Sequence, residues 1–150
     1  MQKSGAKAVF QGSNALTLDA KGRMSIPTRH RDALLQQDNG QLTITRHPDG
    51  CLLVYPRAVW VERREQIMRF PMSARPLQRL LLGYAQDVEM DAAGRVLVAP
   101  ELRTAAGLDR EVTLMGMGSH FELWDAAALA RSEEAALAGG MADVLNNFSF

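Results

Sequence analysis

The sequence contains one short segment twice, once near its beginning and once in its second half. Residues 16–27 read LTLDAKGRMSIP and residues 88–100 read VEMDAAGRVLVAP, with one residue inserted before the second proline. The matched pairs are Asp19 and Asp91, Gly22 and Gly94, and Arg23 and Arg95, all at one constant offset. Two later pairs of segments also match, LTI at 42–44 with VTL at 112–114 and LVY at 53–55 with LWD at 123–125. Since all the matches follow one order, we infer an internal duplication.

Each copy has the pattern of a hairpin, a short helix and a second hairpin. Apolar and polar residues alternate on both sides of the repeated turn, which is typical of half-buried strands. The intervening Asp-x-x-Gly favours a tight turn, because glycine accepts a positive φ. Pro27 and Pro100 then begin helices, since proline is tolerated in a first helical turn. Each half is therefore expected to fold as strand, turn, strand, helix, strand, turn and strand.

The pattern divides the chain into five segments. An apolar stripe at helical spacing, Leu77, Leu80, Leu81 and Tyr84, indicates a helix between the copies, and Ser73 is a candidate N-cap for it. The expected segments are a disordered extension at 1–9, a first half at 10–56, linking helices at 57–85, a second half at 86–125, and a C-terminal helix and tail at 126–150.

The duplication has a direct consequence for stability. One half of this size cannot bury much apolar surface by itself. Two halves that pair their strands can close a small barrel and remove exposed strand edges. We therefore expect an α+β fold in which two pseudo-repeated β-hairpin and helix halves form one β-barrel with flanking helices.

The charges are segregated along the chain, although the formal net charge is zero. Zero net charge argues against the strongly basic domain that non-specific nucleic-acid binders have. However, four cations, Lys21, Arg23, Arg29 and Arg31, lie close together with no acidic residue between them. A local basic cluster of this kind can attract a polyanion. His30 lies within it and is either a phosphate contact or an exposed helix residue.

The sequence predicts no membrane span, signal peptide, disulfide, metal site or active site. No apolar run approaches the roughly 20 residues of a membrane helix, and the first nine residues lack a signal-peptide core. Cys51 is the single cysteine, which suits a reducing cytosol. No metal-ligand spacing and no acid–base or nucleophile pair can be named. We expect a cytoplasmic protein that is not an enzyme and takes no cofactor or small-molecule substrate.

The repeated D-x-x-x-R pattern has a structural and a functional interpretation. In the structural one, Asp19 and Asp91 cap their turns and pair with the arginines. In the functional one, Arg23 and Arg95 are rigidly presented guanidinium groups, which suit phosphate or guanine. For the arginines we favour the functional interpretation, since an exposed ion pair worth under about 1 kcal/mol is a weak reason to keep one spacing twice. The aspartates would orient, and the arginines would touch DNA.

From Phe10 to about Leu129, the chain resembles the MraZ family, within the AbrB-like class of swapped-hairpin barrels. The segments that carry the resemblance are FQG at 10–12, LDAKGR at 18–23, IP at 26–27, RHPDGCLLVYP at 46–56, MDAAGR at 90–95 and FELW at 121–124. The resemblance implies two AbrB-like halves and ring-shaped homo-oligomers. It also implies repression of the division and cell-wall gene cluster that includes the protein's own gene. Binding would be to short G-containing direct repeats in that promoter, through Asp19, Arg23, Asp91 and Arg95.

The chain departs from this family in two places. Members usually begin at Met-Phe-x-Gly, whereas here nine residues precede Phe10. Residues 1–9 are expected to be an upstream start or an added remnant, with no role. The second turn has Ala93 where the first has Lys21. We therefore expect the copies to contribute unequally, with Arg23 and Lys21 the stronger contact with double-stranded DNA.

Few cations per subunit predict weak binding by one subunit, so affinity would come from a ring that presents the motif many times. Candidate ring contacts are apolar helix residues, which could instead cover their own barrel. They are Trp60, Ile67, Leu77, Leu80, Leu81 and Tyr84. Such a regulator would be nucleoid-associated. The alternative is an oligomeric scaffold or protein-binding module without direct DNA recognition, in which the turns are purely structural.

Overall fold

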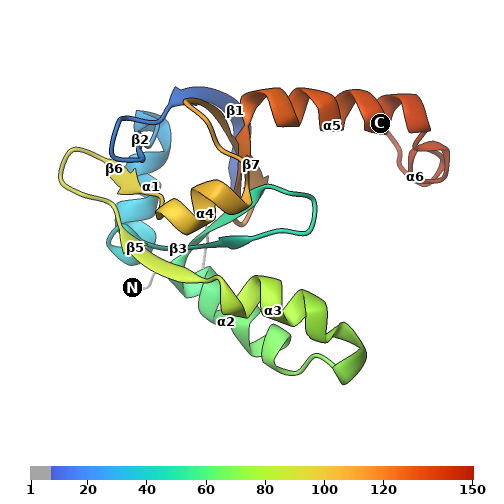
Figure 1. Cartoon of the computed structure of the whole chain (residues 1–150), viewed down its shortest axis with the longest axis horizontal. Coiled ribbons are helices and arrows are strands. Elements are labelled where there is room, and N and C mark those ends of the chain that lie inside the picture. Colours follow the sequence, from blue (N-terminus) through green and yellow to red (C-terminus); the bar gives the residue numbers. More distant parts are fainter. Residues whose placement is uncertain (1–7) are drawn as a thin grey trace.

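The computed structural model describes residues 8–150, so most of the extension expected at 1–9 lies outside the described residues. Strands and helices alternate along the chain in the order anticipated for two similar halves (Figure 1). The strands are β1 (Phe10–Thr17), β2 (Arg23–Ser25), β3 (Gln41–Arg46), β4 (Leu52–Pro56), β5 (Gln86–Glu89), β6 (Arg95–Leu97), β7 (Glu111–Gly118) and β8 (Phe121–Asp125). The helices are α1 (Thr28–Asp38), α2 (Arg57–Met68), α3 (Arg75–Gly83), α4 (Pro100–Ala105), α5 (Ala126–Gly139) and α6 (Ala142–Asn146), with a 3-10 turn η1 (Met72–Ala74).

The fold is mixed α+β with antiparallel sheets. Six strands form one sheet in the order β1-β7-β8-β4-β3-β5, and β2 and β6 form a separate two-stranded ribbon. Among residues 8–150, hydrogen-bonded pairing therefore gives an open sheet with a ribbon beside it, and no single closed ring of strands.

The two halves exchange their first strands. β1 of the first half pairs with β7 of the second, and β5 of the second half pairs with β3 of the first. In the ribbon, Met24 lies opposite Val96, which is its own counterpart in the second copy of the repeat. The halves are thus related by an approximate two-fold axis through the ribbon. Each half covers strand edges of the other, which is the physical benefit expected from the duplication.

The register corrects one part of the sequence alignment. β4 meets β8 with Leu53 opposite Glu122 and Leu52 opposite Leu123. Because β3–β4 and β7–β8 pair in the same way, the counterpart of Leu52 is Phe121 and not Glu122. The match of segment 53–55 with 123–125 is therefore wrong by one residue. The second hairpin has one residue fewer in its turn than the first.

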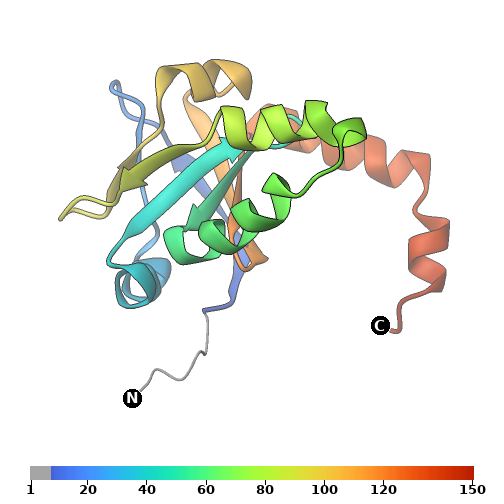
Figure 2. The same ribbon diagram turned by 90° about the horizontal axis from the view of Figure 1, so that it is seen from below.

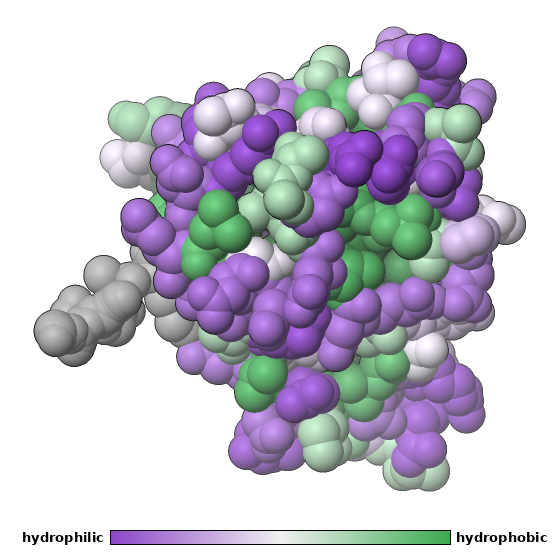
Figure 3. All heavy atoms as spheres, turned by 90° about the vertical axis from the view of Figure 1, so that its left-hand side faces the viewer, coloured by the Kyte–Doolittle hydropathy of each residue, from purple (hydrophilic) through white to green (hydrophobic). Residues whose placement is uncertain are grey.

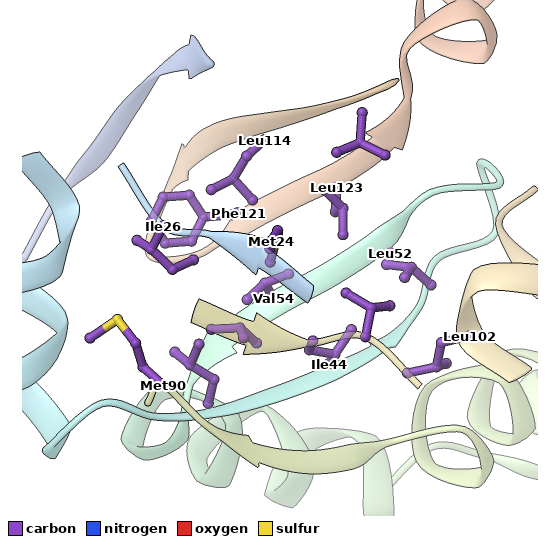
Figure 4. Packing of buried hydrophobic residues seen from close by; sticks show 14 of the residues in the cluster. Met24, Ile26, Ile44, Leu52, Val54, Met90, Leu102, Leu114, Phe121 and Leu123 are labelled. Atoms are coloured by element: carbon purple, nitrogen blue, oxygen red, sulfur yellow. The ribbon is translucent and has the colours of Figure 1, made fainter. Parts of the chain in front are cut away.

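The main core lies between the sheet and the ribbon (Figure 4). Met24 and Ile26 from the first half, and Val96 and Val98 from the second, are fully buried on the inner side of the ribbon. They pack against buried side chains of the large sheet, namely Ile44, Leu52, Val54, Leu114, Phe121 and Leu123. Since each fully buried aliphatic side chain contributes about 1.5–3 kcal/mol, this shared core is what joins the halves.

A second core lies between β4 and the helices α2 and α3. It contains Leu53, Tyr55, Val59, Trp60 and Ile67, all buried within the chain. Trp60 and Ile67 were candidate ring contacts, and this burial makes that interpretation wrong for both. Ser73 also departs from expectation, because it lies within η1 and no side chain caps α3.

The C-terminal helix α5 projects away from the rest of the molecule (Figures 1 and 2). Its start is fixed by Asp125, whose Oδ2 accepts the backbone N–H of Ala128 at 3.1 Å. From Arg131 onward every residue is exposed. Several of these exposed residues are large and apolar, namely Leu137, Met141, Val144, Leu145, Phe148 and Phe150.

Candidate nucleic-acid interface

The first D-x-x-x-R turn connects β1 to β2 and is closed by the side chain of Asp19. Asp19 Oδ1 accepts the backbone N–H groups of Lys21 and Arg23, each at 2.9 Å. Asp19 Oδ2 accepts the Nε–H of Arg23 at 2.7 Å. The backbone N–H of Asp19 donates to the carbonyl oxygen of Arg23 at 2.9 Å. One carboxylate thus fixes the turn backbone and the direction of the guanidinium group.

The second turn, between β5 and β6, has the same hydrogen bonds. Asp91 Oδ1 accepts the backbone N–H groups of Ala93 and Arg95 at 2.9 and 2.8 Å. Asp91 Oδ2 accepts the Nε–H of Arg95 at 2.9 Å. The geometry confirms that both aspartates cap their turns and orient their arginines.

These contacts favour the ionised form of both aspartates. The hydrogen bond from the backbone N–H of Arg23 is the largest influence on the pKa of Asp19, which is lowered from 3.8 to about 2. The pKa of Asp91 is also lowered, first of all by the hydrogen bond from the backbone N–H of Arg95. Each arginine therefore has a permanently charged partner at neutral pH.

Arg23 and Arg95 lie on the outer face of the ribbon formed by β2 and β6. Met24 and Val96 fill its inner face, and side chains alternate across a strand. The side chains of Arg23 and Arg95 are accordingly 30% and 39% exposed. Each guanidinium uses Nε for its aspartate, so within the described residues its four terminal N–H donors remain available.

Each turn is covered by an arginine from the other half. The guanidinium of Arg103 lies against Gly22, and the side chain of Arg31 lies against Gly94. A Cβ atom at either glycine would clash with that arginine. Both glycines also have positive φ angles, +87° and +80°. Glycine is therefore required here for its backbone conformation and for the close approach of the arginine.

The covering arginines are held in the same way in both halves. Arg31 Nε donates to the carbonyl oxygen of Ile26 at 2.6 Å, and Arg103 Nε donates to that of Val98 at 2.9 Å. The basic cluster predicted from the sequence includes Arg31 but not Arg103. The spacing in the sequence could have identified Arg103, because the offset between Arg31 and Arg103 is the same as that between Asp19 and Asp91.

Two other residues of the basic cluster lie elsewhere. Arg29 packs against Gly12, donates from Nη2 to Asn14 Oδ1 at 2.8 Å and from Nε to His30 Nε2 at 3.4 Å, so it contacts β1 and its neighbour in α1. His30 is buried, with its ring edge-on to those of Phe10 and Phe121. Burial also lowers the pKa of His30. The interpretation of His30 as a phosphate contact or an exposed helix residue is therefore wrong, and it is a core residue.

The surface around the turns is polar. Figure 3 looks at the side of the molecule where Figure 1 places the ribbon, and hydrophilic residues dominate it, with separate apolar patches. Lys21 is exposed there, and Ala93 occupies its place in the second turn. Among residues 8–150, no group of three or more His, Cys, Asp or Glu side chains is arranged to hold a metal ion. No helix in the same range is long and apolar enough to cross a membrane.

Two halves that exchange strands and present paired arginine turns define an internally duplicated α+β protein with a cationic β-ribbon on one face. A family model described as "MraZ protein, putative antitoxin-like" matches residues 9–83 and again residues 81–138. The chain belongs to the MraZ family.

Curated relatives support this assignment over almost the full length. The chain is 72% identical to a protein of Bordetella pertussis, 66% identical to one of Herminiimonas arsenicoxydans and 62% identical to one of Paraburkholderia phytofirmans. Each comparison covers 95% of this chain and 100% of the relative. All three relatives are named "Transcriptional regulator MraZ", which supports a role in transcription regulation.

Proposed function

We propose that the chain is a sequence-specific, DNA-binding transcriptional regulator that acts in the cytoplasm, associated with the nucleoid. It would repress the division and cell-wall gene cluster that includes its own gene, by binding direct repeats in that promoter as a ring-shaped oligomer. The observation that carries the proposal is the pair of aspartate-oriented arginines on one face of the β2–β6 ribbon.

The proposed recognition uses the ribbon as the reading element. A two-stranded β-ribbon fits the major groove of B-form DNA, where guanine presents O6 and N7 as adjacent acceptors. The terminal donors of Arg23 and Arg95 match that pair in a bidentate contact. Because Asp19 and Asp91 already hold the guanidinium groups in place, little side-chain entropy is lost on binding. Lys21, Arg31 and Arg103 would contact the phosphate backbone.

The fold supports a finer structural proposal as well. Exchange of β1 and β5 between the halves, with β2 and β6 paired across the two-fold axis, is consistent with an AbrB-like swapped-hairpin barrel. The proposed division places the first half at 10–56 and the second at 86–125, with the linking helices at 57–85 and the C-terminal segment at 126–150.

Affinity would depend on oligomerisation. One subunit offers few unpaired cations, and each neutralised phosphate changes the salt dependence of log K by only about 0.9. Linking several weak sites raises avidity by roughly 10²–10⁴. The exposed apolar residues of α5 and α6 are the strongest candidates for contacts between subunits. Leu77, Leu80 and Leu81 are half-buried, and Tyr84 lies under the guanidinium of Arg46, so these four are secondary candidates.

Selection of bound sequences from random DNA tests the proposal most directly. We expect enrichment of G-containing repeats with the wild-type chain, and altered or lost enrichment with Arg23→Ala and Arg95→Ala tested separately. Arg64→Ala on the exposed side of α2 is a matched control that should behave like wild type. Failure of the wild-type chain to enrich any sequence, or to shift its own upstream DNA, would favour the protein-binding alternative. The exposed C-terminal segment is the observation in favour of that alternative.

A further inference from the structure

A hollow of about 610 Å³ lies beside the first turn and is built from both halves. The first half contributes the end of β1 and the start of the turn, and the second half contributes α4 and the loop that leads to β7. The lining residues are Thr17, Leu18, Asp19, Ala20, Arg103, Leu108, Asp109 and Arg110. A site of this composition could not form from either half alone.

Two arginines from the second half give the hollow its positive charge. Arg103 is fixed by its Nε contact with Val98 and by its position over Gly22. The carbonyl oxygen of Arg110 accepts the backbone N–H of Leu18 at 2.9 Å, which holds the Arg110 backbone beside the turn. Within the described residues, neither arginine has an acidic partner within 4.0 Å.

The acidic groups in the hollow do not cancel this charge. Asp19 is already bound to Arg23 and to two turn amides. Asp109 is exposed, and its own backbone N–H donates to Asp125 Oδ1 at 3.3 Å. Three cations, Lys21, Arg103 and Arg110, thus lie around the first turn, against two carboxylates, that of Asp109 and that of Glu111, the strand partner of Thr17.

The second turn lacks this arrangement. The backbone N–H of Met90, at the second turn, donates to the carbonyl oxygen of Gly40 at 2.9 Å. At the first turn, the backbone N–H of Leu18 donates to the carbonyl oxygen of Arg110 in the same way. Gly40 therefore occupies the place of Arg110. Ala93 likewise occupies the place of Lys21, which removes a second cation. The acids differ as well, with Asn39 and Gln41 in place of Asp109 and Glu111, and Glu89 in place of Thr17. On balance the first turn is the more positive of the two.

We propose that the hollow between Arg103 and Arg110 receives a backbone phosphate of the bound DNA, which makes the first turn the primary docking point of each subunit. This inference rests on the proposed function. A phosphate there would accept charge-assisted hydrogen bonds from two guanidinium groups supplied by one half, while Arg23 of the other half reads the groove. The second turn would also contact the groove, through Arg95, but would make fewer phosphate contacts than the first turn.

Arg110 is the residue to vary, because it is exposed and its side chain forms no hydrogen bond or ion pair with the described residues. We expect Arg110→Ala to weaken binding to a promoter fragment with direct repeats by about 10-fold per bound subunit. We also expect the slope of log K against log salt to become shallower by about 0.9 per bound subunit. Arg110→Lys should keep the slope, and Arg64→Ala should change neither quantity. Melting temperatures should match wild type throughout.

A chemically modified probe locates the contact. Single phosphates of the same fragment are replaced one at a time by neutral methylphosphonates, and binding of wild type and Arg110→Ala is compared. We expect one position at which the substitution weakens wild type but leaves Arg110→Ala unchanged. If wild type binds the fragment and every substitution weakens both proteins equally, the phosphate site is wrong while the proposed function stands. If wild type binds no DNA, the proposed function fails and this inference fails with it.

Discussion

At the scale of single residues, the two turn aspartates combine a structural task with an indirect functional one. Each accepts two backbone N–H groups and one guanidinium N–H, so both carboxylate oxygens form hydrogen bonds within their own turn. Its contribution to DNA binding would be the orientation of Arg23 or Arg95.

The depressed pKa of Asp19 predicts a specific pH dependence. A carboxyl group whose pKa is lower in the folded than in the unfolded chain stabilises the fold above its unfolded value and loses that effect as pH falls. For Asp19 the loss should occur between pH 3.8 and about 2. Urea unfolding of wild type and Asp19→Asn across that range checks it, and the free-energy difference between them should shrink toward acid pH. A constant difference from pH 5 to 2 would contradict the assigned interaction.

Replacement of Arg23 by lysine separates shape from charge. Lysine keeps the positive charge but lacks the fork that engages Asp19 and an acceptor pair at the same time. Arg23→Lys should therefore lower affinity for the preferred repeat while leaving the salt slope close to that of wild type. Titration of a matched and a scrambled repeat at several salt concentrations measures both effects. Equal affinity of Arg23→Lys and wild type for the matched repeat would argue that Arg23 is only a point charge.

At the scale of elements, local sequence patterns predicted the hairpins and helices. They did not predict the features that depend on packing between segments distant in the sequence. The D-x-x-x-R turns follow from turn chemistry that needs only neighbouring residues. The register of β4 does not, because Leu52–Pro56 is buried on both faces and has no alternation to read. Burial of His30 between Phe10 and Phe121, and the position of Arg103 over Gly22, likewise depend on contacts between distant segments.

Gly22 gives a test of the contact between the halves. Gly22→Ala places a Cβ at a φ of +87° and against the Arg103 guanidinium, so we expect a loss of about 1–2 kcal/mol in unfolding free energy. Gly50→Ala is the control, since Gly50 has a similar φ of +99° but nothing within 4 Å of an added Cβ, and it should show the smaller loss that backbone strain alone causes. Chemical denaturation compares the two variants. An equal effect of both substitutions would remove the case for a tight contact at Gly22.

At the scale of the whole molecule, the halves have equivalent roles in the fold and unequal surfaces. The two-fold relation requires each half to provide strands for the other's edges and side chains for one core. Nothing in that requirement constrains exposed positions, so Lys21 and Ala93 can differ freely. The C-terminal segment differs in the same way, because α5 follows β8 as α2 follows β4, yet α2 packs buried residues against β4 and α5 buries none. Its exposed apolar residues belong to neither of the two buried cores.

This segment provides the last prediction. Leu137→Asp combined with Val144→Asp places charge at two side chains that are 71% and 69% exposed, so one subunit should fold unchanged. If α5 and α6 join subunits, the mass by light scattering should fall to that of a single chain, and affinity for DNA with several repeats should drop roughly 10²–10⁴-fold. Ser132→Asp combined with Asn146→Asp adds the same charge at polar positions of the segment and should preserve assembly. An unchanged mass of the first variant would move the subunit contact elsewhere, with Leu77, Leu80 and Leu81 of α3 the next residues to test.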